Sequence, residues 1–100
     1  MSKFQELINS SVPTLVDFHA TWCGPCHAMA PVLQQLAAKV GDNARIIKID
    51  IDKNEQTAAH FQVRAVPTFL LFQNGKVMWR HSGGVPLKTL ENEIQKLVVQ

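Results

Sequence analysis

The order of two strand-like runs and the helical segment between them is the feature that most constrains the fold. Residues 14–20, TLVDFHA, are short and mostly apolar, which predicts a strand buried on both faces. Residues 24–40 place apolar side chains at helical spacing, and Pro31 inside this run predicts a kink. Within residues 45–52, isoleucines alternate with charged residues, which is the period of a strand. Because a strand–helix–strand connection is right-handed and joins parallel neighbours, this order predicts a parallel pair.

The remaining segments predict a hairpin and three further helices. Asn74-Gly75 is a strong hairpin signal, and it joins the apolar run 68–72 to residues 76–82 as an antiparallel pair. Helix ends are expected at a capping box of Ser2 with Gln5, at Gly41, at Asn54 and at Pro86. The whole order predicts an α/β fold with a mixed four-stranded sheet and helices packed on both faces.

Length and composition limit the function classes. The 100 residues suit one domain, 1–100, and 46% hydrophobic with 18% charged residues excludes a disordered chain. A net charge of +2, with lysine and arginine scattered along the chain, argues against a dedicated nucleic-acid binder. No stretch is apolar for long enough to span a membrane, and the N-terminus lacks the layout of a secretory signal. We therefore expect a cytoplasmic protein, in a compartment that keeps thiols reduced.

The hexapeptide WCGPCH, residues 22–27, holds the only two cysteines of the chain, and three chemistries use such a fragment. By spacing, Cys23, Cys26 and His27 fit the attachment signature of haem c, but that site needs a mostly helical wrapping around the cofactor. A structural zinc site needs four ligands, and the other histidines match no zinc-ligand spacing, so we expect no metal. Two inert cysteines fit poorly beside a Gly-Pro pair at a helix start. A redox dithiol fits the strand–helix context best.

The predicted position of the dithiol indicates how it would react. Cys23 would lie near the start of the 24–40 helix, where unpaired N–H groups and the positive end of the helix dipole favour a thiolate. Cys26 lies one turn further on, so the two sulfurs can bond, and we expect it to be the less exposed of the two. Pro25 suits the first turn of a helix, and Gly24 leaves the sulfur open to attack. A thiolate at neutral pH is what thiol–disulfide exchange requires.

Residues 14–31, TLVDFHATWCGPCHAMAP, closely resemble the active-site strand and helix of the thioredoxin family. The resemblance continues in IIKIDIDKN, in VRAVPTFLLFQNG and in the Gly83-Gly84 break, and it covers residues 12–98. It implies a thioredoxin fold in which the first strand of the family's five-stranded sheet is missing, because the chain starts in a predicted helix.

The resemblance implies a catalytic role for four residues. Cys23 matches the attacking cysteine of the family, and Cys26 matches its resolving partner. Asp17 matches the carboxylate that serves as base for the second cysteine, and burial inside a strand would raise its pKa toward that role. Lys48 matches the lysine on the neighbouring strand. The alternatives are an Asp at the edge of a strand and an ordinary exposed strand lysine.

The resemblance also implies a surface that binds substrate. Pro67 matches the family's cis-proline beside the dithiol, where the backbone of Val66 would pair with an extended substrate segment. The apolar contact patch would be formed by Trp22, Gly24, Pro25, Val66, Gly83 and Gly84. For the two glycines, plain turn chemistry remains the alternative.

His19 and His27 depart from the family pattern, which commonly has tryptophan at the first position and lysine or arginine at the second. Both can be tolerated variable positions. The alternative is an effect of charge, since histidine titrates near neutral pH and a protonated His27 beside the dithiol would favour the thiolate. Because of these departures the sequence does not give the reduction potential, but the class of reaction is unaffected.

The sequence thus predicts a protein-disulfide reductase and electron carrier that acts by thiol–disulfide exchange through Cys23 and Cys26, with no bound cofactor. The resemblance implies two kinds of partner, an NADPH-dependent thioredoxin reductase and oxidised client proteins, and we expect a monomer. Two alternatives remain: a disulfide oxidant or isomerase of an exported compartment, and a thioredoxin-fold binding subunit of a complex. The Gly-Pro pair between the cysteines resembles reductases, and an intact dithiol argues against a subunit that only binds.

Overall fold

Four strands form one sheet in the order β2-β1-β3-β4 in the computed structural model, which describes residues 2–98. The strands are β1 (Thr14–His19), β2 (Arg45–Asp50), β3 (Thr68–Gln73) and β4 (Lys76–Ser82). β1 pairs with β2 in parallel and with β3 in antiparallel orientation, and β3 pairs with β4 in antiparallel orientation. The mixed four-stranded sheet expected from the sequence is therefore confirmed.

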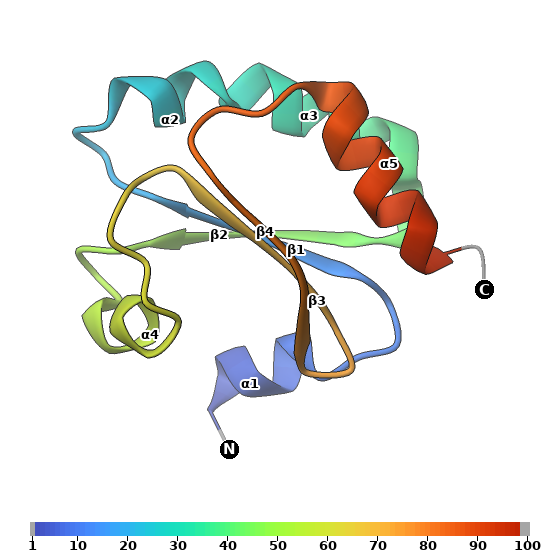
Figure 1. The fold of residues 1–100 in the computed structure, drawn as a ribbon, viewed down its shortest axis with the longest axis horizontal. Coiled ribbons are helices and arrows are strands. Elements are labelled where there is room, and N and C mark those ends of the chain that lie inside the picture. Colours follow the sequence, from blue (N-terminus) through green and yellow to red (C-terminus); the bar gives the residue numbers. More distant parts are fainter. Residues whose placement is uncertain (1, 99–100) are drawn as a thin grey trace.

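Helices cover both faces of this sheet (Figure 1). One face carries α2 (Gly24–Ala28), α3 (Ala30–Val40) and α5 (Leu87–Val98), and the other carries α1 (Lys3–Ile8) and α4 (Glu55–His60). A short 3-10 helix, Gly41–Asn43, connects α3 to β2. The capping box of Ser2 with Gln5 is present at the start of α1, as the sequence predicted.

A hydrophobic cluster lies on each face of the sheet. Successive side chains of β1 point alternately into one cluster and the other, so the strand is apolar and covered on both faces. Leu15 packs in the cluster beneath α3 and α5, whereas Val16 and Phe18 pack in the cluster beneath α1 and α4. All three side chains are 0% exposed. Asp17 lies among them, so the strand carries one charged side chain into the middle of the molecule.

The helix predicted over residues 24–40 is divided in two, and this corrects the expectation of one kinked helix. α2 ends at Ala28 and α3 begins at Ala30, with Met29 capping both. Pro31 lies in the first turn of α3, where its missing N–H leaves no helical hydrogen bond unmade. The interruption therefore precedes the proline, and the dithiol lies on a short helix of its own.

Asn54 stands at the N-cap position of α4, as expected, but its side chain does not cap the helix. Its Nδ2 instead donates to the carbonyl oxygen of Asp50 at 3.0 Å. This bond joins the end of β2 to the start of α4, because the amide reaches back across the turn rather than forward into the helix.

Replacing Leu36 by alanine should destabilise the fold by about 2–5 kcal/mol, the usual cost of a cavity in a packed core. The Leu36 side chain is 0% exposed and lies in the cluster between α3 and the sheet. Urea unfolding of Leu36→Ala and of the matched control Gln35→Ala, an exposed residue of the same helix, measures the difference. We expect the control to stay within about 0.5 kcal/mol of the parent, and equal losses in both variants would contradict the packing described here.

Candidate active site

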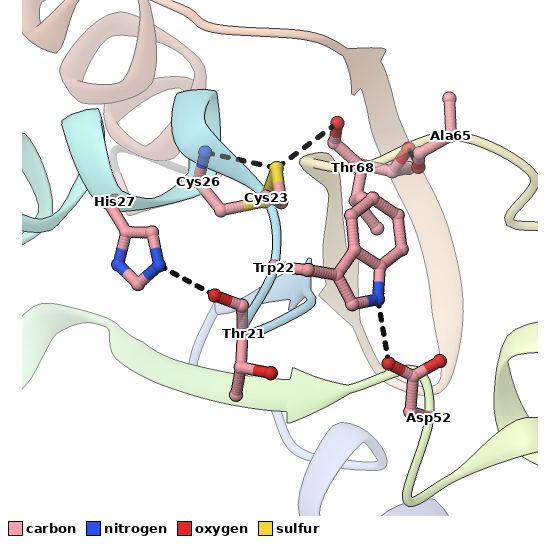
Figure 2. The surroundings of a disulfide bond; sticks show 9 residues. Thr21, Trp22, Cys23, Cys26, His27, Asp52, Ala65 and Thr68 are labelled. Carbon is pink, nitrogen blue, oxygen red and sulfur yellow. Dashed lines mark hydrogen bonds between the residues drawn. A yellow bond between two sulfur atoms is a disulfide. The ribbon is translucent and has the colours of Figure 1, made fainter.

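Cys23 and Cys26 form a disulfide at the start of α2, just beyond the end of β1 (Figure 2). Their Cα atoms are 5.3 Å apart, within the usual range for a disulfide. Cys23 is the N-cap residue of α2, and its Sγ accepts the backbone N–H of Cys26 at 3.1 Å. A sulfur in this position would be stabilised as a thiolate, because it receives one of the N–H groups left unpaired at a helix start.

The segment before β3 lies directly against this sulfur. The Sγ atom of Cys23 is 3.6 Å from the carbonyl oxygen of Val66, and the peptide bond between Val66 and Pro67 is cis. The carbonyl oxygen of Pro67 accepts the N–H of Gly83 at 2.8 Å, so the turn after β4 is tied to the same place. Gly83 has φ +96°, a left-handed conformation that favours glycine, so turn geometry alone accounts for this residue type.

Trp22 stands at the outer side of the disulfide and is 68% exposed, so it is no part of the core. Its Nε1 donates to Oδ2 of Asp52 at 2.9 Å, which fixes the ring relative to the turn after β2 (Figure 2). The sequence gives no sign that Asp52 belongs to the site. It appears there only as one of the charged residues that alternate with isoleucines in residues 45–52. Gly24 and Pro25 are exposed beside Trp22.

Asp17 lies on the other side of Cys26, and it lines a cavity of about 170 Å³ together with that residue. The remaining lining residues are His19, Ala20, Thr21, His27, Ala30 and Lys48. Asp17 is 2% exposed, and its Oδ1 is the buried side-chain polar atom without a hydrogen-bond partner among residues 2–98. Burial raises the pKa of this carboxyl above its ordinary value of 3.8, while His19 and Lys48 act in the opposite direction.

Lys48 faces Asp17 in the register of the parallel pair, which is the neighbourhood expected for it. It is exposed, and over residues 2–98 the ion pair found is a different one, between Lys96 and Glu93. Lys48 therefore acts on Asp17 through its charge across the strands and not through a direct bond.

The expectation that Cys26 is less exposed than Cys23 is wrong for the disulfide form. In the disulfide form Cys23 is 4% exposed and Cys26 is 8% exposed, so Cys26 is not the more buried residue. The reason is that the Val66–Pro67 segment and the N–H of Cys26 both cover the sulfur of Cys23. The sulfur of Cys23 is therefore largely covered in the disulfide form.

Neither a metal site nor a membrane-spanning helix is found in the described part of the chain. Over residues 2–98, no three His, Cys, Asp or Glu side chains are placed so that they could share a metal ion. Within the same residues, no helix has both the length and the apolar character to cross a membrane.

Comparisons with known proteins agree with this geometry. The model of the family described as Thioredoxin matches residues 1–96. The chain is 45% identical over 95 residues to chloroplastic thioredoxin Y of rice, covering 94% of this chain and 56% of that relative. It is 43% identical over 90 residues to the thioredoxin of Haemophilus influenzae, covering 90% and 84% respectively. A solved mutant thioredoxin from Halobacterium salinarum superimposes with a TM-score of 0.90 at 31% identity, covering 100% of this chain and 87% of that one.

The chain belongs to the thioredoxin family. Membership, together with the disulfide between Cys23 and Cys26, identifies a thiol–disulfide redox carrier with protein-disulfide oxidoreductase activity. The described residues hold four strands in one sheet, with α1 before β1. The rice relative is longer, and this chain spans little more than half of it.

Replacing Asp17 by asparagine should stabilise the oxidised protein at neutral pH. Because the native pKa of Asp17 is raised, the folded state binds the proton more tightly than the unfolded state, and stability is lost as pH rises from the unfolded pKa through the native one. Asparagine has no charge to bury and removes this loss. A separation of one pKa unit corresponds to about 1.4 kcal/mol.

Urea unfolding between pH 3 and pH 9 tests this expectation, with Asp42→Asn as the matched control. Asp42 is an exposed aspartate in the 3-10 helix, so its replacement should keep the pH dependence of the parent. If Asp17→Asn follows the parent at every pH, the carboxyl is not destabilised by burial.

Proposed function

We propose that this chain is a protein-disulfide reductase and electron carrier, in which Cys23 attacks the substrate disulfide and Cys26 resolves the product. The observation that carries the proposal is the N-cap position of Cys23, whose sulfur accepts the N–H of Cys26 at 3.1 Å. In the reduced protein this donor favours the thiolate, which is the form that attacks a disulfide.

The proposed reaction has two exchange steps. The Cys23 thiolate attacks one sulfur of a client disulfide, that bond breaks, and a mixed disulfide forms while the first client thiolate leaves and takes a proton from water. Cys26 then loses its proton, and its sulfur attacks the sulfur of Cys23. This releases the second client thiolate, so the client gains two electrons and the Cys23–Cys26 pair becomes the disulfide seen in the structure.

Asp17 is the proposed base for the second step. It shares a cavity with Cys26, and burial raises its pKa toward the range in which a carboxylate can accept a proton from a thiol. The cavity of about 170 Å³ has several ionisable side chains in its lining and is large enough to hold water. Lys48 lies opposite Asp17 in the register of the parallel pair. Its positive charge lowers the pKa of Asp17 and so opposes the effect of burial.

The proposed client site is the surface around the disulfide. The carbonyl of Val66 lies beside the sulfur of Cys23, so an extended client segment pairing with this backbone would bring its own sulfur to Cys23. The other proposed contacts are Trp22, Gly24, Pro25, Pro67, Gly83 and Gly84. Main-chain pairing of this kind is tolerant of side chains, which suits a carrier with many clients.

The wider assignment is also part of the proposal. Family membership implies a reductase and client proteins as partners in general terms, and we propose that the reductase draws its electrons from NADPH. Residues 1–100 would act as one monomeric domain with the dithiol as its only redox group. A cytoplasmic location is supported by the proposed direction of the reaction, because a reductase works where thiols are kept reduced.

Replacing Cys26 by serine should trap clients as mixed disulfides on Cys23, because the attack that releases them is removed. Non-reducing gels of the variant, incubated with oxidised insulin and then with a cell extract, measure this. Cys23→Ser is the matched control and should capture nothing. Stable binding of one partner by the parent, with an empty trap, would instead favour a binding subunit.

The direction of transfer is tested on the parent protein by equilibration with glutathione buffers. A reductase should remain oxidised at ratios where glutathione itself is largely reduced, and it should reduce insulin when a thioredoxin reductase and NADPH are supplied. A pair that oxidises glutathione readily would favour the alternative of a disulfide oxidant or isomerase.

Replacing Asp17 by alanine should slow the release step by roughly 10- to 100-fold, at the low end of what general acid–base catalysis contributes. The measurement is single-turnover release of client from a preformed Cys23 mixed disulfide between pH 6 and pH 9. Asp42→Ala, an exposed aspartate, should release client at the parent's rate. Release that is equally fast in Asp17→Ala across this range would remove the proposed base.

A further inference from the structure

His19 stands two residues after Asp17 on β1, and alternation along a strand puts the two side chains on the same face of the sheet. Both residues line the cavity of about 170 Å³ beneath α2, with Cys26 on its other wall. Asp17 is 2% exposed, whereas His19 at the end of the strand is half-buried. The histidine therefore lies between the buried carboxyl and the surface of the molecule.

A buried base needs a way to lose the proton that it gains. Once Asp17 has accepted the proton of Cys26, it must release that proton before the next cycle, and its own oxygens have little direct access to solvent. Three other ionisable side chains line the same cavity, namely His19, His27 and Lys48. Each of them lies closer to the surface than Asp17, so each is a candidate for the acceptor.

The three candidates differ in the nitrogen atoms that they have free to accept a proton. Lysine carries its proton at neutral pH, so Lys48 offers no free lone pair. Nε2 of His27 lies 2.8 Å from the carbonyl oxygen of Thr21, and since a carbonyl only accepts, that nitrogen is held as a donor and Nδ1 is the one nitrogen of this ring left to accept a proton. In contrast, none of the side-chain hydrogen bonds found over residues 2–98 involves the ring of His19, so neither of its nitrogens is held in the role of a donor.

We propose that His19 is a positioning residue that takes the proton of Cys26 from Asp17 and delivers it to solvent. This inference rests on the proposed function, in which Asp17 serves as the base. The proton first passes from the Cys26 thiol to the Asp17 carboxylate. It then passes from the carboxylic acid to the neutral imidazole of His19, directly or over water in the cavity, and the imidazolium releases it to bulk water. The carboxylate and the neutral imidazole are restored, and no electrons move in these transfers.

The charges that face His19 suit this cycle. Asp17 lies on its own strand, Asp50 lies opposite it in the register with β2, and Lys48 and His27 line the same cavity from β2 and α2. The groups that face His19 are thus two carboxyls, one lysine and one further histidine. A protonated His19 in turn lowers the pKa of Asp17, which helps to restore the carboxylate after each transfer.

The experiment measures single-turnover release of client from the Cys23 mixed disulfide between pH 6 and pH 9. His19→Ala should slow release on the order of 10-fold and lose the limb of the pH profile that belongs to the histidine. Added imidazole should restore most of the rate, because it can enter the space left by the side chain. His60→Ala, an exposed histidine on α4 on the opposite face of the sheet, should behave like the parent with and without imidazole.

Two further variants separate a proton route from a packing role. His19→Gln fills the site but cannot titrate, so it should stay as slow as His19→Ala, and a parental rate in this variant would overturn the inference. In the double variant Asp17→Asn with His19→Ala, release should be no slower than in Asp17→Asn alone, because the histidine acts through the carboxyl.

The outcomes also distinguish this inference from the proposed function. A slow Asp17→Asn with a parental His19→Ala profile would overturn the histidine route and leave the base in place. A parental Asp17→Asn would remove the base itself, and the histidine route with it. A slow His19→Ala that imidazole does not restore would likewise count against the proton route.

Discussion

The sheet pairing of β1 is the constraint on which the rest of the structure depends. The strand pairs with β2 on one edge and β3 on the other, and helices cover both of its faces. Because helices cover both faces of the strand, Asp17 is only 2% exposed, and this burial raises the pKa of its carboxyl. The same strand leads into the segment that carries Cys23, so one element positions both the buried carboxyl and the dithiol.

The division of the helix at Met29 has a related effect on the site. α2 is short, and its start is occupied by the sulfur of Cys23, while α3 continues in a separate helix that packs on the sheet through Leu33 and Leu36. Core packing and redox chemistry are thus assigned to different helices. Leu33 and Leu36 of α3 lie in the larger core cluster, whereas Cys26 of α2 packs with Ala20 and Cys23.

Much of this arrangement could be predicted from the sequence, because it depends on local patterns. The parallel pair followed from residues 14–52, the hairpin from Asn74-Gly75, and the helix-start position of Cys23 from its place after a buried strand. What local patterns could not give are contacts between distant segments. The bond from Trp22 to Asp52, the cis bond at Pro67 beside the dithiol, and the cavity that joins His19 to Cys26 arise only when the strands are laid side by side. The break at Met29 differs from the single kinked helix that the sequence predicts, because Pro31 lies in the first turn of a new helix instead of bending a continuous one.

The strand order has a consequence for how these molecules meet one another. β2 and β4 form the two outer edges of the sheet, and each has backbone groups that a neighbouring chain could in principle pair with. Both edges carry exposed cations, Arg45 and Lys48 on one and Lys76 and Arg80 on the other. A second copy that extended the sheet would have to bring these cations close together, and this repulsion disfavours strand pairing at the open edges.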